Sequence, residues 1–562
     1  METFLKTCLS SALGLISGSP FHATGTGVVD GAQKMHLVNN SNGSTHPSVI
    51  SPHSYKSNTK YKTHTNKSTN LMLEDSSSTI PPDIQASPTM TGTDYSTSGR
   101  WVRRLGYAER FMSQAHDYGC MTTVYSLWLE SRIPLDYEHI KQASVIMFRK
   151  MPNLRLHLDH LDDDVWWREM TREVVDVEEL ATDDVEATIQ LLVRRRYHMQ
   201  EGPLWFARFV TLDPNEECVR DNNHNLKYKY VCIFGFHHNI SDGSTNMKFC
   251  QVFLKVLNDL VQGKDIDMCQ EGTFAMPLQD DLGNNLASIW FVMGIFLSRL
   301  YNIILTHGFP VWNFINYYRM PVEMEAGTHV LQQNELDENV TRKLISRCKM
   351  EGVTLNSAFT AAANLAMYKM MLDKNSNLDE TNLCSQQAIN MRRYWPKHLR
   401  QDGFGCHISL LDVIFPTKRS DLNAFWEYAR GIHGILNYHL TETKRAIKLL
   451  PMSERLSIII RHNYLMSKLG LPSASDNHYT VTNMGNLNST FPGTGEEVEV
   501  SKVFRSVSCH FMPTLCQHTL QTFRGRFCYS LDYYAHKMTR ETASQYAKEI
   551  IDTLTSSIHV PN

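Results

Sequence analysis

The feature that most constrains this chain is an uncharged apolar segment at 230–236 that runs directly into the residues HHNISDG at 237–243. A short apolar run that ends in a turn favours a buried β-strand. After the turn, apolar residues recur at the spacing of a core-facing helix stripe, at positions 249, 252, 253, 256, 257 and 260. A strand, a tight turn and a long helix in this order predict a mixed α/β fold.

The two histidines at the end of this strand are the first candidates for chemistry. Neighbouring side chains of a strand point to opposite faces, so His237 and His238 cannot serve one site in the same way. We interpret one ring as structural and His238 as a candidate base, with a merely packed or solvated ring as the alternative. Because their side chains point to opposite faces, the two histidines also cannot both bind one metal ion, which argues against a metal site here. The pair Asp242-Gly243 closes the turn and leaves the carboxylate free to pair with a distant cation.

The polar N-terminal segment sets the domain organisation. Residues 1–100 of the 562 are rich in Ser, Thr, Asn, Gly and Pro, and such a segment buries too little apolar surface to offset its ordering entropy. We therefore predict a disordered leader over 1–100. Its first residues, 1–18, fit a weak signal peptide, a short amphipathic membrane-touching helix or neither.

Charge and cysteine usage exclude several classes of protein. Lys and Arg number 55 against 58 Asp and Glu, a net charge of −3, which excludes a globally basic nucleic-acid binder. The twelve cysteines include no pair with CxxC spacing, so neither a zinc ribbon nor a compact disulfide framework is indicated. A reducing, cytoplasmic location fits best.

The most hydrophobic stretch of the chain lies at 286–305. Two serines, an arginine and an asparagine interrupt it, which favours a buried or interfacial helix over a membrane span. Peripheral contact with the membrane of the endoplasmic reticulum or of lipid droplets through this stretch is a hypothesis.

The residues HHNISDG match the HHxxxDG signature, and the chain resembles the chloramphenicol acetyltransferase-like superfamily of thioester-dependent acyltransferases, which includes alcohol acetyltransferases, condensation domains and polyketide-associated diacyltransferases. Further segments agree in order: RLGYAER at 104–110, a helix at 335–348 followed by GVTLNS at 352–357, AINMRR at 388–393 and TNMG at 482–485. The likeness covers roughly 101–560, and HHxxxDG is its specific motif.

This resemblance implies an architecture. It predicts two α/β lobes that form a V with a central tunnel. Separately, we expect a monomer. The N-terminal lobe with HHxxxDG would span 101–265, an apolar crossover or lid 266–330, and the C-terminal lobe 331–562.

The resemblance also implies roles for the site residues. His238 would be the general base of a direct transfer without an acyl-enzyme, and His237 and Gly243 would be structural. Asp242 would be an architectural carboxylate paired with Arg392, with Arg393 as the competing partner. Asn483 would help to stabilise the oxyanion, with a turn-forming asparagine as the alternative.

The function implied is an acyl-CoA-dependent O-acyltransferase that acts on a small or lipophilic alcohol. Acyl-CoA is then a cosubstrate, and neither a bound cofactor nor a metal is expected. One alternative is an N-acyltransferase or condensation-type enzyme that forms an amide or ester from a carrier-protein thioester. Another is a non-catalytic descendant that binds a lipid or a partner. Nucleic acid is not an expected partner.

Overall fold

The computed structural model describes residues 99–212, 228–276, 310–321, 324–331, 334–396, 403–450, 453, 456–471, 477–491 and 496–559. The leader predicted over 1–100 lies outside the described residues except for its last two positions. The apolar stretch 286–305 also lies outside them.

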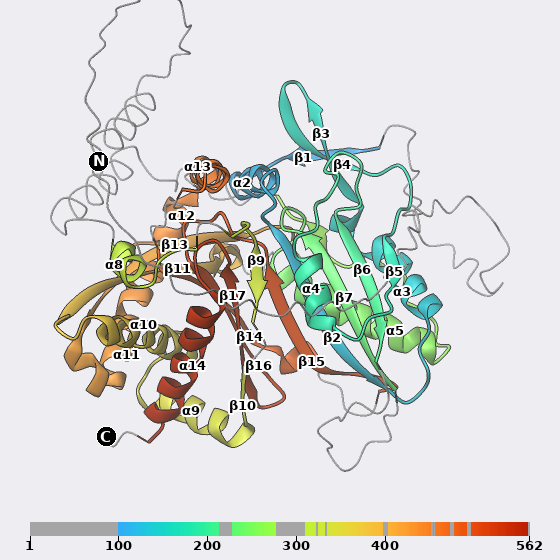
Figure 1. Cartoon of the computed structure of the whole chain (residues 1–562). Coiled ribbons are helices and arrows are strands. Elements are labelled where there is room, and N and C mark those ends of the chain that lie inside the picture. The colour runs from blue at the N-terminus through green and yellow to red at the C-terminus, as the bar shows by residue number, and fades with distance from the viewer. Residues whose placement is uncertain are drawn as a thin grey trace, which may run out of the picture. The chain divides into compact units, whose positions relative to one another are not determined.

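The first sheet carries the HHxxxDG strand in its centre. It has five strands in the order β15-β2-β7-β6-β5, and β7 (Tyr228–His237) lies between β2 (Thr122–Ser131) and β6 (Trp205–Thr211). Every residue of β7 from Tyr230 onward is buried, which explains its continuous apolar character. The helices α3 (Tyr137–Lys150) and α5 (Gly243–Val261) pack on this sheet and on each other (Figure 1).

The second sheet forms the other lobe. Its strands run in the order β10-β17-β16-β14-β11-β13, and β9 pairs with β17. Long helices pack over it, with α10 between α11 and α14 (Figure 1). The bounds are β9 (Thr328–Val330), β10 (Asn334–Leu336), β11 (Glu380–Asn390), β13 (Ile408–Lys418), β14 (Tyr479–Asn486), β16 (Cys516–Phe523), β17 (Arg526–Tyr534), α9 (Glu338–Met350), α10 (Leu355–Lys374), α11 (Phe425–Asn437) and α14 (Arg540–Ser557).

One strand crosses from the second half of the chain into the first sheet. The strand β15 (Val498–Val507) follows β14 in sequence but pairs antiparallel with β2, from Val498 opposite Ser131 to Val507 opposite Thr123. Figure 1 shows the red β15 beside the blue β2. The lobe boundary at 331 stays a prediction. Within the predicted C-terminal lobe, 331–562, the strand β15 belongs to the first sheet and completes it.

The remaining elements are short or peripheral. A small sheet has the order β1-β4-β3, and β8 pairs with β12. Their bounds are β1 (Trp101–Arg104), β3 (Leu156–Leu161), β4 (Asp164–Glu169), β5 (Val177–Glu179), β8 (Thr273–Phe274), β12 (Gly403–Phe404), α2 (Tyr107–His116), α4 (Val185–Leu192), α8 (Pro310–Tyr317), α12 (Arg445–Lys448) and α13 (Leu456–Lys468).

Each sheet has its own hydrophobic core, which confirms the predicted two-lobed α/β class. One core gathers around β2, β6, β7 and α5, and the other around α10, α11, α14 and the second sheet. A third, smaller cluster contains residues from both halves of the chain, such as Phe111, Cys406 and Tyr534.

The helix predicted near 335 begins three residues later. Residues Asn334–Leu336 form β10, because they pair with β17 at the edge of the second sheet. Asp337 then caps α9 by accepting a hydrogen bond from the amide of Val340. Gly352, with φ +67°, ends the turn after this helix, and Thr354 caps α10.

The close packing of β7 on β6 yields a prediction. A Cβ atom on Gly235 would lie 2.1 Å from ring carbons of Phe206, which is the residue paired with it across the strands. We expect Gly235→Ala to lower the free energy of unfolding by about 1–3 kcal/mol, because the ring must leave its packed position. Chemical denaturation of the two proteins measures the difference.

A matched glycine provides the control. Gly431 lies within α11, and a Cβ atom there would meet nothing within 4 Å. We expect Gly431→Ala to raise the stability by about 0.5–1 kcal/mol, because glycine is a poor residue inside a helix. Equal effects of the two substitutions would contradict the packing described for Gly235.

Candidate functional site

The two histidines at the end of β7 make backbone hydrogen bonds to opposite sides of the strand. The amide of His237 donates to the carbonyl of Leu204 on one side, and the amide of His238 donates to the carbonyl of Met121 on the other, both at 2.9 Å. His237 pairs with Thr122 on β2. Alternation along the strand then places His238 on the face of Phe236, which packs against α5.

His237 is held as a packed ring. It is fully buried, and its Nδ1 accepts a hydrogen bond of 3.0 Å from the amide of Asn239. The ring contacts His116 at a centroid distance of 4.4 Å. Burial, together with the two neighbouring histidines, lowers the pKa of His237 well below its usual value. The neutral ring of His237 stabilises the turn through this hydrogen bond. It lies on the opposite face of the strand from His238.

His238 is neutral and almost enclosed, with 5% of its surface exposed. Burial lowers its pKa to about 4, and the positive charge of Arg505 acts in the same direction. Its Nδ1 lies 3.8 Å from the Sγ of Cys406. At neutral pH this imidazole therefore has an unprotonated nitrogen, which is the state that a general base requires.

Asp242 has a structural position in which both of its oxygens are occupied. Its Oδ1 accepts from the amide of Thr245 at 3.0 Å and thereby caps α5. Its Oδ2 accepts from Nη1 of Arg392 at 2.6 Å and from the amide of His407 at 2.8 Å. Burial alone would raise the pKa of Asp242, but Arg392 and these hydrogen bonds lower it to about 2. The carboxylate is ionised, and its two oxygens hold the start of α5, Arg392 and the backbone of His407 together.

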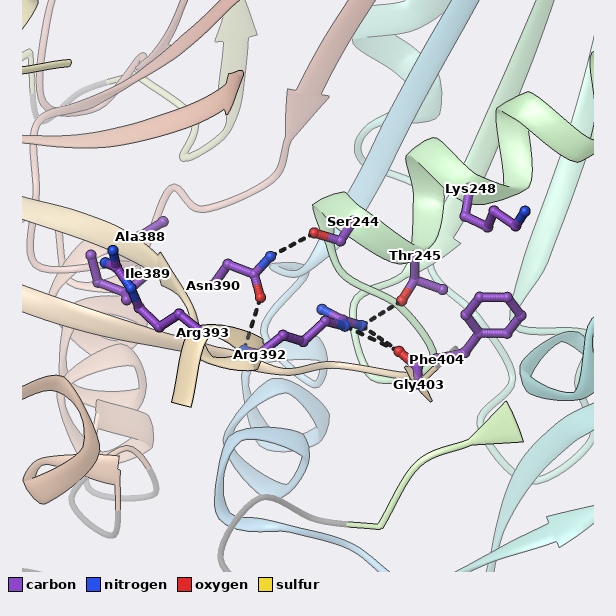
Figure 2. A pocket seen from close by; sticks show the side chains of 10 residues that line it. All are labelled: Ser244, Thr245, Lys248, Ala388, Ile389, Asn390, Arg392, Arg393, Gly403 and Phe404. Atoms are coloured by element: carbon purple, nitrogen blue, oxygen red, sulfur yellow. Dashed lines mark hydrogen bonds between the residues drawn. The ribbon is translucent and has the colours of Figure 1, made fainter. Parts of the chain in front are cut away.

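Of the two candidate arginines, the structure pairs Arg392 with Asp242. Arg392 lies in the helical turn Met391–Tyr394 after β11, and its Nη2 also bonds Thr245 Oγ1 at 2.9 Å and the carbonyl of Gly403 at 2.9 Å. Figure 2 shows this side chain reaching toward the first turn of α5. Arg393 does not take part in the pair. It lines the neighbouring pocket instead.

The segment TNMG approaches the histidine turn through its methionine. A Cβ atom on Gly243 would lie 3.2 Å from the Sδ of Met484, so the absence of a side chain at Gly243 allows this approach. Asn483 is exposed, and its Oδ1 accepts from the amide of Gly485 at 2.8 Å. Its carbonyl oxygen therefore organises a local turn, and only its amide nitrogen is left to donate elsewhere.

A pocket of about 490 Å³ lies beside the first turn of α5 (Figure 2). Three cationic side chains line it, and one of them, Arg392, is committed to Asp242. Lys248 is 39% exposed and lies 3.5 Å from a carboxylate oxygen of Glu271. The third cation is Arg393. The other residues around the pocket are uncharged and come from α5, β11 and β12: Ser244, Thr245, Ala388, Ile389, Asn390, Gly403 and Phe404.

Sequence reasoning missed three residues of this region. Cys406 and Arg505 act on the candidate base, and the hydroxyl of Tyr125 lies at Arg505 and near the position of Gly243. A signal existed for Arg505 alone, because it is a charged residue inside the strand-like run KVFRSV at 502–507. Nothing marks Tyr125 or Cys406 in the sequence, since they come from β2 and from the loop before β13.

Two absences hold for the part of the chain that the structure describes. Within it, no group of three or more His, Cys, Asp or Glu side chains is arranged to hold a metal ion. None of its helices is long and apolar enough to cross a membrane.

Solved structures share this fold. No family model matches the chain, and no curated protein matches it by sequence. A trichothecene 15-O-acetyltransferase from Fusarium sporotrichioides superposes with a TM-score of 0.55 at 12% identity, over 82% of this chain and 98% of that one. The first condensation domain of the calcium-dependent antibiotic synthetase, in complex with a substrate analogue, gives 0.54 at 13% identity, over 82% and 97%. The epimerization domain from the third module of tyrocidine synthetase B gives 0.53 at 12% identity, over 82% and 97%. The chain therefore has the two-lobed fold of these proteins.

The buried pair of Asp242 and Arg392 yields a second prediction. Asp242→Asn removes the negative charge and leaves the guanidinium of Arg392 buried without its counterion. We expect the free energy of unfolding to fall by about 3–5 kcal/mol, together with the soluble yield. Denaturation monitored by circular dichroism measures the loss.

The control is an exposed aspartate that also faces an arginine. Asp379 is 91% exposed and lies 3.7 Å from Arg419, so we expect Asp379→Asn to change the stability by less than about 1 kcal/mol. An Asp242→Asn protein with an unchanged melting temperature would show that Asp242 is not architectural.

Proposed function

We propose that this protein is a thioester-dependent acyltransferase in which His238 acts as the general base. The observation that carries the proposal is the state of His238: a neutral imidazole at the end of β7, in a turn that the ion pair of Asp242 and Arg392 holds rigid. The two histidines lie on opposite faces of the strand and have different surroundings. This difference agrees with the structural role of His237 and the catalytic role of His238 that the HHxxxDG resemblance implies. The solved acetyltransferase and condensation domain with the same fold support acyl transfer.

The proposed reaction needs no acyl-enzyme. A nitrogen of His238 takes the proton of the acceptor hydroxyl while the acceptor oxygen forms a bond to the thioester carbonyl carbon. The tetrahedral intermediate then collapses, and the carbon–sulfur bond breaks. The thiolate leaves and takes the proton from the imidazolium, so the base is neutral again after each turnover. The ester and the free thiol are the products.

The developing oxyanion requires hydrogen-bond donors, and we keep the TNMG segment as the candidate source. The contact between Met484 and the position of Gly243 places this segment next to the histidine turn. The amide nitrogen of Asn483 and the backbone of Met484 and Gly485 are the groups that would donate. Asn483 also has the turn-forming role described above.

We propose acyl-CoA as the donor. Coenzyme A carries phosphates, and the pocket beside α5 offers Lys248 and Arg393 at its lining, with the hydroxyl of Ser244 nearby. Arg393 is a cation that the pair with Asp242 does not use. A local basic rim of this kind suits an anionic cosubstrate on a chain of nearly neutral net charge.

The acceptor we propose is an alcohol, because the solved trichothecene 15-O-acetyltransferase, which has the same fold, acts on oxygen, as its name states. An amine acceptor or a carrier-protein thioester would use the same base and is the alternative. The solved epimerization domain has the same fold, although its name states another reaction. The fold by itself therefore does not specify acyl transfer, and the variant of the base tests it.

Loss of the base is the direct test. We expect His238→Ala to lower the rate of thiol release from acetyl-CoA and longer acyl-CoAs, in the presence of a panel of alcohols and amines, by about 100- to 10,000-fold. A thiol-reactive chromophore follows the reaction, and mass spectrometry identifies the ester or amide.

His198 is the matched control, since it is exposed. We expect His198→Ala to keep the activity of the unsubstituted protein. Turnover that survives His238→Ala unchanged would refute the role of the base. A protein that shows no turnover with or without the substitution, yet binds lipid tightly, would be a non-catalytic binding protein.

The lowered pKa of His238 gives a prediction for the pH dependence. With an acceptor alcohol that does not ionise, kcat/KM should stay level as the pH falls from neutral to about 5, because the imidazole with a pKa of about 4 is still unprotonated there. It should fall about tenfold for each further unit below the pKa. An ascending limb near pH 6.5, the ordinary value for histidine, would contradict the burial of the base. Circular dichroism at each pH establishes that the protein is folded.

A further inference from the structure

Arg505 is a buried cation that lies between the two sheets. It is 4% exposed and comes from β15, opposite Tyr125 on β2. Its Nε donates to the hydroxyl of Tyr125 at 3.1 Å, and its Nη1 donates to the hydroxyl of Thr519 on β16 at 3.2 Å. One partner thus belongs to the first sheet and the other to the second, so the guanidinium lies at the junction of the lobes.

Other buried arginines have a carboxylate in contact. Arg103 pairs with Glu109 at 2.8 Å, and Arg392 pairs with Asp242 at 2.6 Å. Among the described residues Arg505 forms no ion pair, and its hydrogen-bond partners are two neutral hydroxyls. An isolated buried charge is costly, so a counterion from outside the chain would stabilise this arrangement.

A buried carboxylate within electrostatic reach of Arg505 is engaged elsewhere. Asp532 on β17 accepts hydrogen bonds from Ser506 Oγ at 2.9 Å and from the amide of Val507 at 3.1 Å. Burial raises its pKa to about 7, although those bonds and Arg505 oppose the rise. Both of its oxygens are thus engaged by β15, and among the described residues it makes no ion pair with Arg505.

Arg505 lies on the same face of the first sheet as the candidate base. Tyr125 pairs with both Arg505 and Phe234, and paired residues of neighbouring strands project to one face. Along β7 and its continuation, Phe234, Phe236 and His238 alternate onto this face. The charge of Arg505 is close enough to His238 to lower the pKa of the imidazole.

A second unsatisfied polar group lies beside Tyr125. Asn246, in the first turns of α5, is 1% exposed, and neither atom of its side-chain amide completes a hydrogen bond within the described residues, although it approaches the hydroxyl of Tyr125. Asn246 and Arg505 thus both lie at the hydroxyl of Tyr125, and a polar ligand at this place would complete the hydrogen bonds of the amide.

We propose that Arg505 binds a carboxylate of the acceptor, so that the acceptors of this protein are hydroxy acids in preference to neutral alcohols. This proposal rests on the proposed acyl transfer. Nη2 of the guanidinium makes no hydrogen bond among the described residues and is the donor for the carboxylate, with Nη1 able to join it in a bidentate contact. The bound anion compensates the buried charge, which favours the imidazolium that forms on His238 when the hydroxyl is deprotonated. Arg505 is then a specificity-determining residue in addition to the base.

Pairs of acceptors that differ in charge test the proposal. We would measure kcat/KM with acetyl-CoA for lactate, mandelate and ricinoleate, each against its methyl ester, in the unsubstituted protein and in Arg505→Gln and Arg505→Lys. The expected ratio of acid to ester is about 10- to 100-fold for at least one pair, the range for a hydrogen bond to a charged group. Arg505→Gln should bring this ratio to about one, because the acids lose rate relative to their esters, and Arg505→Lys should give an intermediate ratio.

The control is Lys502→Gln on the same strand, because Lys502 lies over the ring of Trp128 at 4.8 Å and outside the junction. It should keep the ratio. The proposal is overturned if the unsubstituted protein turns over the esters as well as the acids. It is also overturned if Arg505→Gln slows acid and ester equally, which would indicate a role in the transition state of every acceptor.

Binding without turnover separates this proposal from the proposed function. Calorimetry on His238→Ala compares mandelate, ricinoleate and their methyl esters, and the same titrations on the double variant with Arg505→Gln measure what the arginine contributes. Acids that bind in preference to esters, with the preference lost in the double variant, support the carboxylate site even if no acyl transfer is found. Transfer to neutral alcohols together with no such preference would retain the function and reject the site.

Discussion

The buried ion pair between Asp242 and Arg392 is the interaction on which the rest of the site depends. It joins the turn after β7 in the first sheet to the helical turn after β11 in the second. Each charge would be costly in this enclosed position without the other, so the two turns are held together. The same carboxylate begins α5 as its N-cap. The contact also anchors the turn in which His238 lies, four residues earlier.

A second connection comes from β15, which leaves the second half of the chain to complete the first sheet. Its pairing with β2 carries Arg505 to the junction of the lobes, between Tyr125 and Thr519. The candidate base and the buried arginine therefore come from strands more than 250 residues apart in the chain, at 238 and 505, yet share one face of a sheet. A proposed acceptor between them would be positioned by both lobes.

Much of this architecture could be predicted from local patterns. The apolar strand and the stripe on α5 are visible as patterns of apolar residues. The turn between them, the helix end near Gly352 and the helix start after Thr354 are marked by individual residues that favour such positions. The start of α9 differs from the prediction, because pairing of β10 with β17 competes with helix formation there. Asn483 could be placed in a turn but not positioned against the base, since that depends on the approach of Met484 to Gly243.

The sequence by itself determined that His237 and His238 face opposite ways, because alternation is a local property of a strand. It also determined the turn at Asp242 and Gly243 and the beginning of the helix. Only the tertiary structure decided which of two adjacent arginines meets Asp242, how far burial lowers the pKa of His238, and that Arg505 is buried with neutral partners. These properties depend on the dielectric surroundings and on charges brought in from distant strands, which no local pattern of residues encodes.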